Sequence, residues 1–309
     1  MSKQLQRLLV RSFSSSPRAL SLHIHRPRRT LIDIATKFSS LKPITMVTAH
    51  DYLTSKMGER VGFDIALVGD SLAMTTLGLQ DTNELTLDEF LYHVKSVERG
   101  NKESFLVADL PFGSFEKSVE QAVDTSIRLV KEGKVQAVKV EGGNEEILPT
   151  ITKLVAIGIP VMGHVGLTPQ RHNSFGGFKL QGNSVETSSK IYNECLALQK
   201  AGVFSIVLEC IPNKLSEFIT NKLKVPTIGI GAGPSTSGQV LVVADLLGMC
   251  EPESHKAKFV KQYSNVFDQG VKGMEEYKRE VEERTFPEGA KHGYKMNKEV
   301  WEKFSERVS

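Results

Sequence analysis

Short apolar segments alternate with longer amphipathic segments along most of the chain, from Leu41 to about residue 250. The apolar segments are four or five residues long and rich in Val and Ile, as is typical of strands buried on both faces. Eight of them are present, at residues 44–48, 65–68, 105–108, 137–140, 161–164, 205–208, 227–230 and 240–243. Strands that alternate with helices pair in parallel, and eight such strands close a barrel. We therefore predict an α/β protein with a (β/α)8 TIM barrel; a doubly wound sheet is the alternative fold.

Helical segments fit between these strands, at residues 87–100, 118–133, 187–202 and 214–223. Thr86 is suited to cap the first of them. The second and third end at Gly133 and Gly202, and glycine is suited to the left-handed position that follows a helix.

No linker rich in Pro or Ser interrupts residues 41–250, which predicts a single domain. We assign residues 33–294 to this catalytic barrel and its C-terminal helical extension. Within the extension, residues 256–283 have the pattern of one or two amphipathic helices. Residues 295–309 form a charged tail.

The charge of the chain is divided between a basic N-terminal segment and an acidic remainder. Residues 1–32 contain seven Lys and Arg residues and no Asp or Glu, whereas the whole chain has a formal charge of +3. The rest of the chain holds 32 basic and 36 acidic side chains. Because an acidic body lacks the positive surface that nucleic acid requires, we expect no nucleic-acid partner.

The basic segment 1–32 is also rich in serine, as in Arg11-Ser12-Phe13-Ser14-Ser15-Ser16. This composition is typical of a mitochondrial transit peptide. A secretory signal would need a longer apolar centre than residues 8–10 provide. We therefore expect import into the mitochondrial matrix; a disordered basic tail is the alternative.

Two further observations exclude classes of protein and site. No apolar stretch approaches the roughly 18 residues of a membrane-spanning helix, so no membrane partner is expected. The three cysteines, Cys195, Cys210 and Cys250, are odd in number and have no C-x-x-C spacing. They predict neither a disulfide framework nor a zinc site.

Polar residues follow most of the predicted strands. The C-terminal ends of barrel strands meet on one face, which is where barrel active sites lie. The residues at these ends are Asp51, Asp70, Ser71, Asp109, Glu141, His164, Glu209 and a Gly231-Ala232-Gly233 turn. Four carboxylates, those of Asp70, Asp109, Glu141 and Glu209, would converge there and repel one another without a cation. A ligand set made of oxygen atoms favours Mg2+ over zinc, which prefers His and Cys.

Asp70 and Asp109 are the expected direct ligands of this metal, and Glu141 binds it either directly or through water. Each aspartate by itself is explained equally well as the N-cap of the next helix. Three carboxylates at corresponding positions favour the metal site.

Lys139 precedes Glu141 by two residues, so both side chains leave the same face of a strand. We interpret Lys139 as the partner of a substrate carboxylate. A buried ion pair with Glu141 and a lysine that forms a Schiff base are the alternatives.

Glu209 follows an apolar segment and precedes Cys210. Apolar surroundings raise carboxyl pKa values, which makes Glu209 the candidate general base; pairing with a buried cation is the alternative. His164 either binds a substrate carboxylate or forms a hydrogen bond with a backbone carbonyl. Gly229-Ile230-Gly231-Ala232-Gly233 lacks the spacing of a dinucleotide site, and we interpret it as a close backbone approach or an anion seat.

Around these residues the sequence resembles the ketopantoate hydroxymethyltransferase family, over nearly its full length. The motifs that carry the resemblance are Thr45-Met46-Val47-Thr48-Ala49-His50-Asp51-Tyr52, Leu67-Val68-Gly69-Asp70-Ser71, Ala108-Asp109-Leu110-Pro111-Phe112, Val138-Lys139-Val140-Glu141-Gly142-Gly143, Gly163-His164-Val165-Gly166-Leu167-Thr168-Pro169-Gln170, Phe175-Gly176-Gly177, Leu208-Glu209-Cys210-Ile211-Pro212 and Ile228-Gly229-Ile230-Gly231-Ala232-Gly233.

The resemblance implies a barrel of the phosphoenolpyruvate/pyruvate-binding type, assembled as a homo-oligomer, a decamer of two five-membered rings. It implies that Asp70 and Asp109 bind Mg2+, with Glu141 at its water shell, and that Glu209 accepts a proton. The residues expected to bind substrate are Asp70, Ser71, Asp109, Lys139 and His164.

The implied reaction transfers a hydroxymethyl group from 5,10-methylenetetrahydrofolate to 3-methyl-2-oxobutanoate, which gives 2-dehydropantoate in the first step of pantothenate biosynthesis. Mg2+ would chelate the carboxylate and keto oxygens and stabilise the enolate that forms when Glu209 removes the C3 proton. A 2-oxo acid aldolase or lyase that needs no folate, on the same barrel, is one alternative. A catalytically silent barrel that serves as an assembly or ligand-binding subunit is another.

Overall fold

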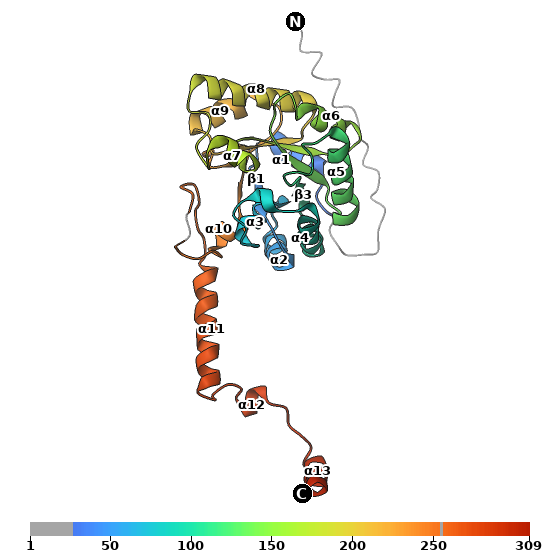
Figure 1. Ribbon diagram of the computed structural model, residues 1–309, viewed down its shortest axis with the longest axis vertical. Coiled ribbons are helices and arrows are strands. Elements are labelled where there is room, and N and C mark those ends of the chain that lie inside the picture. Colours follow the sequence, from blue (N-terminus) through green and yellow to red (C-terminus); the bar gives the residue numbers. More distant parts are fainter. Residues whose placement is uncertain (1–26, 254–255) are drawn as a thin grey trace.

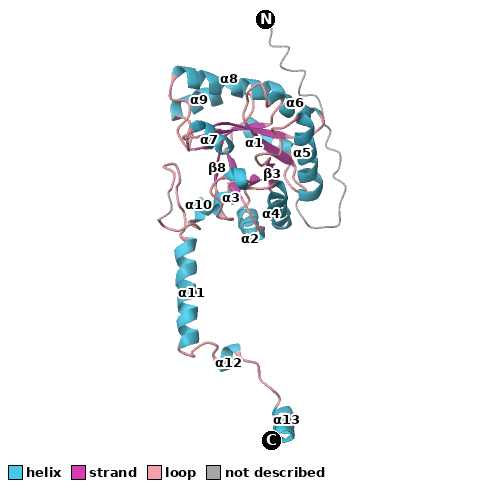
Figure 2. Ribbon diagram, in the orientation of Figure 1, coloured by secondary structure: helices cyan, strands magenta, loops and turns pink. Residues whose placement is uncertain are grey.

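A computed structural model describes residues 27–253 and 256–309, so predictions for residues 1–26 lie outside the described residues. Its centre is a closed barrel of eight parallel strands in sequence order (Figures 1 and 2). The strands are β1 (Ile44–Thr48), β2 (Ile65–Val68), β3 (Phe105–Asp109), β4 (Ala137–Glu141), β5 (Val161–Gly166), β6 (Ser205–Glu209), β7 (Thr227–Ile230) and β8 (Gly238–Leu241). The predicted (β/α)8 TIM barrel is confirmed.

Most of the predicted strand bounds agree with the structure. β1, β2 and β7 coincide with their predictions, and β3 to β6 continue past the predicted ends. Three of these end on carboxylates that a search for apolar segments leaves out: Asp109, Glu141 and Glu209. The prediction for the eighth strand was wrong by two residues, because β8 begins at Gly238, where it pairs with Ile44 of β1. Val243, the predicted end of that strand, begins helix α10 (Val243–Leu247).

Helices surround the barrel (Figure 2). They and the short helical turns are α1 (Leu31–Ser39), α2 (Tyr52–Val61), α3 (Leu72–Thr75), η2 (Thr82–Glu84), α4 (Leu87–Gly100), α5 (Val119–Gly133), α6 (Leu148–Ala156), η3 (Pro169–Arg171), α7 (His172–Phe175), α8 (Val185–Ala201) and α9 (Asn213–Lys222).

The predicted helix caps are confirmed in two places and wrong in one. Thr86 caps α4, and Gly202 follows α8 in the left-handed conformation with φ 94°. After α5, however, Lys134 adopts that conformation, and Gly133 is the last helical residue. Glycine is needed at 133 for packing, because a Cβ atom there would lie 2.6 Å from Val94 Cγ1 on α4.

The strands carry an outer and an inner layer of side chains. Outward-facing residues such as Leu106 and Val140 pack against the helices. Inward-facing residues such as Phe105 and Val107 form a separate apolar core inside the barrel. Because side chains alternate along a strand, the inward series of β3 continues from these two residues to Asp109. The interior therefore changes from apolar to charged toward the C-terminal ends of the strands.

Residues 27–32 belong to the folded unit. Arg28 donates to the Asn101 carbonyl at 2.6 Å, and Arg29 donates to the Phe63 carbonyl at 3.0 Å, both at the N-terminal ends of the strands. Helix α1 then buries Ile34 against the inner core. The leader predicted at residues 1–32 therefore overlaps a segment that is bound to the barrel.

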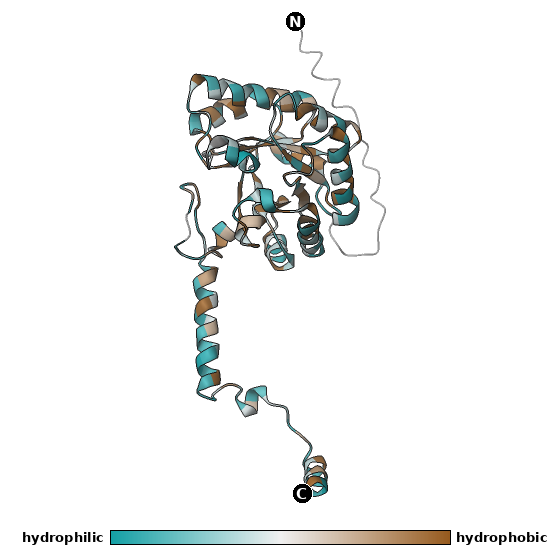
Figure 3. Cartoon of the chain, viewed as in Figure 1, coloured by the Kyte–Doolittle hydropathy of each residue, from teal (hydrophilic) through white to brown (hydrophobic). Residues whose placement is uncertain are grey.

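Beyond the barrel, the chain continues as α11 (Val266–Glu282), α12 (Gly289–His292) and α13 (Lys298–Val308), which extend away from it (Figure 1). Residues 256–265 are not helical, so the predicted amphipathic segment forms one helix, α11. None of its residues is buried, and apolar side chains such as Met274 and Val281 are exposed. Hydrophobic and hydrophilic residues alternate along the ribbon of this helix (Figure 3). Among the described residues, no helix is long and apolar enough to span a membrane.

Candidate active site

The structure brings the predicted site residues together at the C-terminal end of the barrel. Asp109 is the register partner of Lys139, and Glu141 is the register partner of His164. Partners on neighbouring parallel strands point to the same side, so these four side chains enter the barrel beside one another. Their side chains are at most 6% exposed, so each charge requires a partner.

Lys139 is surrounded by carboxylates. Its Nζ atom lies 3.0 Å from Asp109 Oδ1, so the buried ion pair forms across strands instead of with Glu141. Burial lowers the pKa of Lys139, but Asp109, Glu141 and Asp70 raise it by more, to above its ordinary value. The amine is therefore charged at neutral pH. This argues against a Schiff base, which requires a neutral amine.

Asp70 follows β2, and its backbone N–H donates to Asp109 Oδ2 at 3.0 Å. Burial, Asp109 and Glu141 raise the pKa of Asp70 well above its usual range. Three buried carboxylates thus share one ammonium group, and a cation would offset the negative charge that remains.

His164 lies between two carboxylates. Its Nε2 atom is 3.2 Å from Glu209 Oε2, and its Nδ1 atom is 3.5 Å from Glu141 Oε1 and 3.2 Å from Lys139 Nζ. Burial and Lys139 lower the pKa of His164, but Glu141 and Glu209 raise it by more, to about 9. A protonated ring is thus within ion-pair distance of both carboxylates, although neither contact has the geometry of a hydrogen bond. Of the two predicted roles, the hydrogen bond to a backbone carbonyl is not found within the described part of the chain.

Glu209 ends β6, and its side chain is 15% exposed, more than those of Asp109 and Glu141. The sequence predicted apolar surroundings for it, whereas the structure gives it a polar neighbour, His164, and partial access to solvent. The backbone around Glu209 is tightly constrained. Gly166 on β5 has φ 94°, and a Cβ atom there would collide with the Glu209 carbonyl oxygen.

Ser71 faces the same space as Asp109. It lies at the N-terminal end of α3, but its side chain makes no capping hydrogen bond. A Cβ atom at Gly69 would lie 3.1 Å from Ser71 Oγ and 3.7 Å from Asp109 Oδ2. The glycine therefore leaves open the space into which the hydroxyl and the carboxylate point.

Two of the features predicted at the mouth have structural roles. Asp51 is the N-cap of α2, where its carboxylate accepts the Thr54 N–H at 2.7 Å. The glycine turn at 231–233 does give a close backbone approach, since Cβ atoms would lie 2.7 Å from Phe259 at Gly231 and 2.6 Å from Asn213 at Gly233. Side chains of the protein itself fill that space.

Sequence reasoning assigned no role to Gln170, which is 4% exposed and lies at the centre of the site. Its Nε2 atom donates to Asp70 Oδ2 at 2.8 Å and to the Leu110 carbonyl at 2.9 Å. Its backbone N–H donates to Glu141 Oε2 at 3.1 Å. Its place in the loop after β5 was the available signal, but the direction of its side chain depends on the fold of that loop.

The oxygen atoms present fit a hard cation. Glu141 Oε1 is buried without a hydrogen bond to any described residue, and Gln170 Oε1 is in the same situation. Across residues 27–253 and 256–309, no three acidic, His or Cys side chains converge closely enough to hold one cation among them. Mg2+ keeps several water molecules and needs only one or two carboxylate ligands from the protein, so two of these carboxylates would be enough to hold it.

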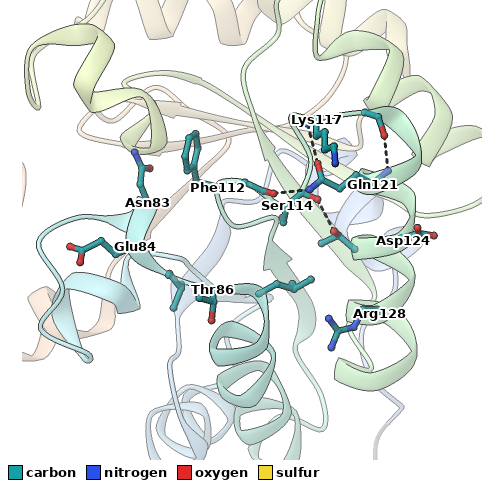
Figure 4. A pocket seen from close by; sticks show the side chains of 14 residues that line it. Asn83, Glu84, Thr86, Phe112, Ser114, Lys117, Gln121, Asp124 and Arg128 are labelled. Atoms are coloured by element: carbon teal, nitrogen blue, oxygen red, sulfur yellow. Dashed lines mark hydrogen bonds between the residues drawn. The ribbon is translucent and has the colours of Figure 1, made fainter.

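A surface pocket of about 660 Å3 lies beside the site, between the start of α4, the loop after β3 and α5 (Figure 4). Phe112, three residues after Asp109, lines it, as do Lys117 and Arg128. None of the predicted site residues lines this pocket.

Comparison with known proteins gives close relatives over the whole chain. A 3-methyl-2-oxobutanoate hydroxymethyltransferase of Emericella nidulans is 46% identical over 97% of this chain and 85% of its own. The Saccharomyces cerevisiae protein of the same name is 42% identical over 100% and 98%. An Arabidopsis thaliana relative, named as mitochondrial, is 46% identical over 87% and 78%.

Solved structures with the same fold are more distant in sequence. A phosphonopyruvate hydrolase in complex with oxalate and Mg2+ matches with a TM-score of 0.54 and 15% identity, over 90% of this chain and 96% of that one. A 2,3-dimethylmalate lyase of the phosphoenolpyruvate mutase/isocitrate lyase superfamily matches with 0.55 and 14%, over 91% and 95%. The sequence profile of ketopantoate hydroxymethyltransferase matches residues 28–289. With this match and relatives more than 40% identical, the chain belongs to the ketopantoate hydroxymethyltransferase family.

Proposed function

We propose that this protein transfers a hydroxymethyl group from 5,10-methylenetetrahydrofolate to 3-methyl-2-oxobutanoate. The product is 2-dehydropantoate, and the reaction is the first step of pantothenate biosynthesis. The observation that carries the proposal is the buried cluster of Asp70, Asp109, Glu141 and Lys139, with His164 and Glu209 beside it, in a chain of this family.

Lys139 and Ser71 are suited to bind the carboxylate of the 2-oxo acid. Lys139 is charged and held in place by Asp109 at 3.0 Å. The Ser71 hydroxyl faces the same space and has no capping role that would occupy it. An ammonium and a hydroxyl that are already oriented lose little entropy when they bind an anion. His164, also buried here, is proposed as a further substrate-binding residue.

Asp70 and Asp109 would hold Mg2+, with Glu141 either a ligand or a partner of its water molecules. When bound, Mg2+ would polarise the keto oxygen and offset the negative charge that develops on it. Asp70 Oδ2 and Glu141 Oε2 accept hydrogen bonds from Gln170, which orients both carboxylates within the site.

Glu209 is proposed to remove the proton from C3 of the substrate. The C3–H bond breaks, the proton moves to the carboxylate, and the electron pair enters the enolate. The C3 carbon then forms a bond with the methylene carbon of the folate. Both carbon–nitrogen bonds of that methylene group break, and one water molecule supplies the hydroxyl group. The two nitrogens each take up one proton, one from water and one from Glu209, which leaves tetrahydrofolate. His164, 3.2 Å from Glu209, orients the base toward the interior of the barrel.

We further propose a mitochondrial matrix enzyme that assembles as a homo-oligomer, with a decamer as the family expectation. The composition of residues 1–32 and the Arabidopsis relative support the location. The exposed apolar side chains of α11 support assembly, since a helix with no buried residue is only marginally stable by itself.

The test uses protein that lacks residues 1–26, incubated with 3-methyl-2-oxobutanoate, methylenetetrahydrofolate and Mg2+, with and without a chelator. We expect 2-dehydropantoate by mass spectrometry, dependent on the folate and lost with the chelator. Product formed from formaldehyde at the same rate without folate would instead support the aldolase. No product from folded, metal-loaded protein would support the silent barrel.

A further inference from the structure

Gln170 connects two carboxylates of the site, Asp70 and Glu141. Its side chain amide reaches Asp70, which follows β2, and the Leu110 carbonyl, which follows β3. Its backbone N–H reaches Glu141 at the end of β4. A single residue of the loop after β5 thus contacts the ends of three other strands.

We propose that Gln170 is a positioning residue that fixes Asp70 and Glu141 in the orientation that binds the divalent cation. This inference rests on the metal centre of the proposed function and deepens it. Gln170 occupies one oxygen of each carboxylate, Asp70 Oδ2 and Glu141 Oε2. The other oxygen of Glu141, Oε1, is left buried without a hydrogen bond within the described residues and is therefore available to a cation or its water.

The choice of glutamine follows from what the position requires. Both N–H groups of the amide are used, one on Asp70 and one on the Leu110 carbonyl. A glutamate here would donate neither bond and would add a negative charge to a cluster that already has three. The amide is neutral, so it orients the Asp70 carboxylate and leaves the negative charge of that carboxylate to the cation.

The acceptor oxygen of Gln170 supports the same role. Oε1 is buried and has no hydrogen-bond donor in the part of the chain that the structure describes. A buried carbonyl oxygen without a hydrogen bond is unfavourable, unless a bound water or ligand supplies the donor. A water molecule bound to the cation would supply this donor. Gln170 Oε1 and the two oriented carboxylates would then all bind the same hydrated ion.

The experiment measures Mn2+ binding by electron paramagnetic resonance, with Mg2+ as competitor, and needs no turnover. Gln170→Ala removes the amide, and Gln170→Met keeps the volume of the side chain without its hydrogen bonds. We expect both variants to bind Mn2+ about 10- to 100-fold more weakly than the unsubstituted protein. In steady-state assays, the Mg2+ concentration for half-maximal rate rises by a similar factor, and kcat at saturating Mg2+ falls less.

Gln136→Ala is the matched control. Gln136 also bridges separate segments, accepting the Leu106 N–H and donating to the Arg29 carbonyl, but at the opposite end of the barrel. We expect this variant to lower Tm and to leave Mn2+ affinity unchanged. Unchanged Mn2+ affinity in folded Gln170→Ala and Gln170→Met would overturn the inference alone. Absence of Mn2+ binding in the unsubstituted protein would overturn the metal centre of the proposed function instead.

Discussion

His164 Nε2 lies 3.2 Å from Glu209 Oε2, so a buried imidazole on the neighbouring strand lies at ion-pair distance from the candidate base. The two residues come from β5 and β6, whose pairing fixes the distance between their backbones. Glu209 is thereby oriented before any substrate arrives.

Glu209→Gln removes the proposed base while it keeps the size of the side chain. We expect kcat to fall about 10²- to 10⁴-fold, because general base catalysis contributes that much, with KM for the 2-oxo acid changed little. Exchange of the C3 proton for deuterium in D2O, followed by NMR without folate, should fall by the same factor. Glu217→Gln, an exposed position on α9, is the control for loss of a charge. Wild-type exchange in Glu209→Gln would remove Glu209 from the proposed role.

Gly166→Ala tests whether the backbone beside Glu209 controls activity. Gly166 has φ 94°, and its Cβ atom would collide with the Glu209 carbonyl oxygen. Gly158 has φ 90° but open space around it, so Gly158→Ala introduces the strain without the collision. We expect each variant to lose about 1–2 kcal/mol of unfolding free energy from the left-handed backbone. Only Gly166→Ala should lose more than this and also lower kcat; equal effects would contradict the argument.

Asp64→Asn tests an anchor at the N-terminal end of the barrel. Asp64 accepts the Thr45 N–H and hydroxyl, each at 2.7 Å, and pairs with Lys37. Burial raises the pKa of Asp64, but Lys37 and Thr45 lower it by more, to below its ordinary value of 3.8. A carboxyl with a lowered folded pKa stabilises the protein above its unfolded pKa, and this stability is lost as the pH falls through the folded pKa.

We therefore expect Asp64→Asn to cost about 1.5–3 kcal/mol at pH 7, the range for hydrogen bonds to charged groups. Denaturant unfolding between pH 7 and pH 3 should show the difference from the unsubstituted protein shrink only below about pH 4. A difference that is the same at all these pH values would show that the ionised form of Asp64 is not responsible.

Truncation tests where the predicted leader ends. Protein that begins at residue 27 keeps Arg28 and Arg29, whereas protein that begins at residue 30 loses their hydrogen bonds to the Asn101 and Phe63 carbonyls. We expect the first to have the Tm of the full chain and the second a lower Tm. N-terminal sequencing of protein recovered from mitochondria should find a start before Arg28. A mature start after Arg29 would contradict this expectation.

The sequence predicted the barrel because eight apolar segments must each be buried, and their order leaves few arrangements. It also predicted that these carboxylates lie together, since carboxylates at the ends of parallel strands necessarily meet on one face. The sequence could not predict which carboxylate pairs with Lys139. Whether its ammonium contacts Glu141 on the same strand or Asp109 on the next one depends on strand register, which no local pattern records.

Contacts that loops make with residues far away in the sequence could not be predicted either. Gln170 contacts Asp70, which is 100 residues earlier in the chain. The leader predicted at residues 1–32 includes Arg28, which binds a backbone carbonyl, and arginine composition alone cannot separate such a residue from a targeting residue.

The charged site lies at the C-terminal ends of the barrel strands, and the inner apolar core lies further toward their N-terminal ends. Phe105 and Val107 lie in the inner apolar core, and Asp109 follows on the same strand and the same side. Substitutions that improve packing in the inner apolar core, or that strengthen the attachment of α1, introduce no new group beside the charged site. The thermal stability of the protein can therefore be raised by substitutions in the apolar core, while the side chains of the candidate site, and with them the substrate preference, stay as they are.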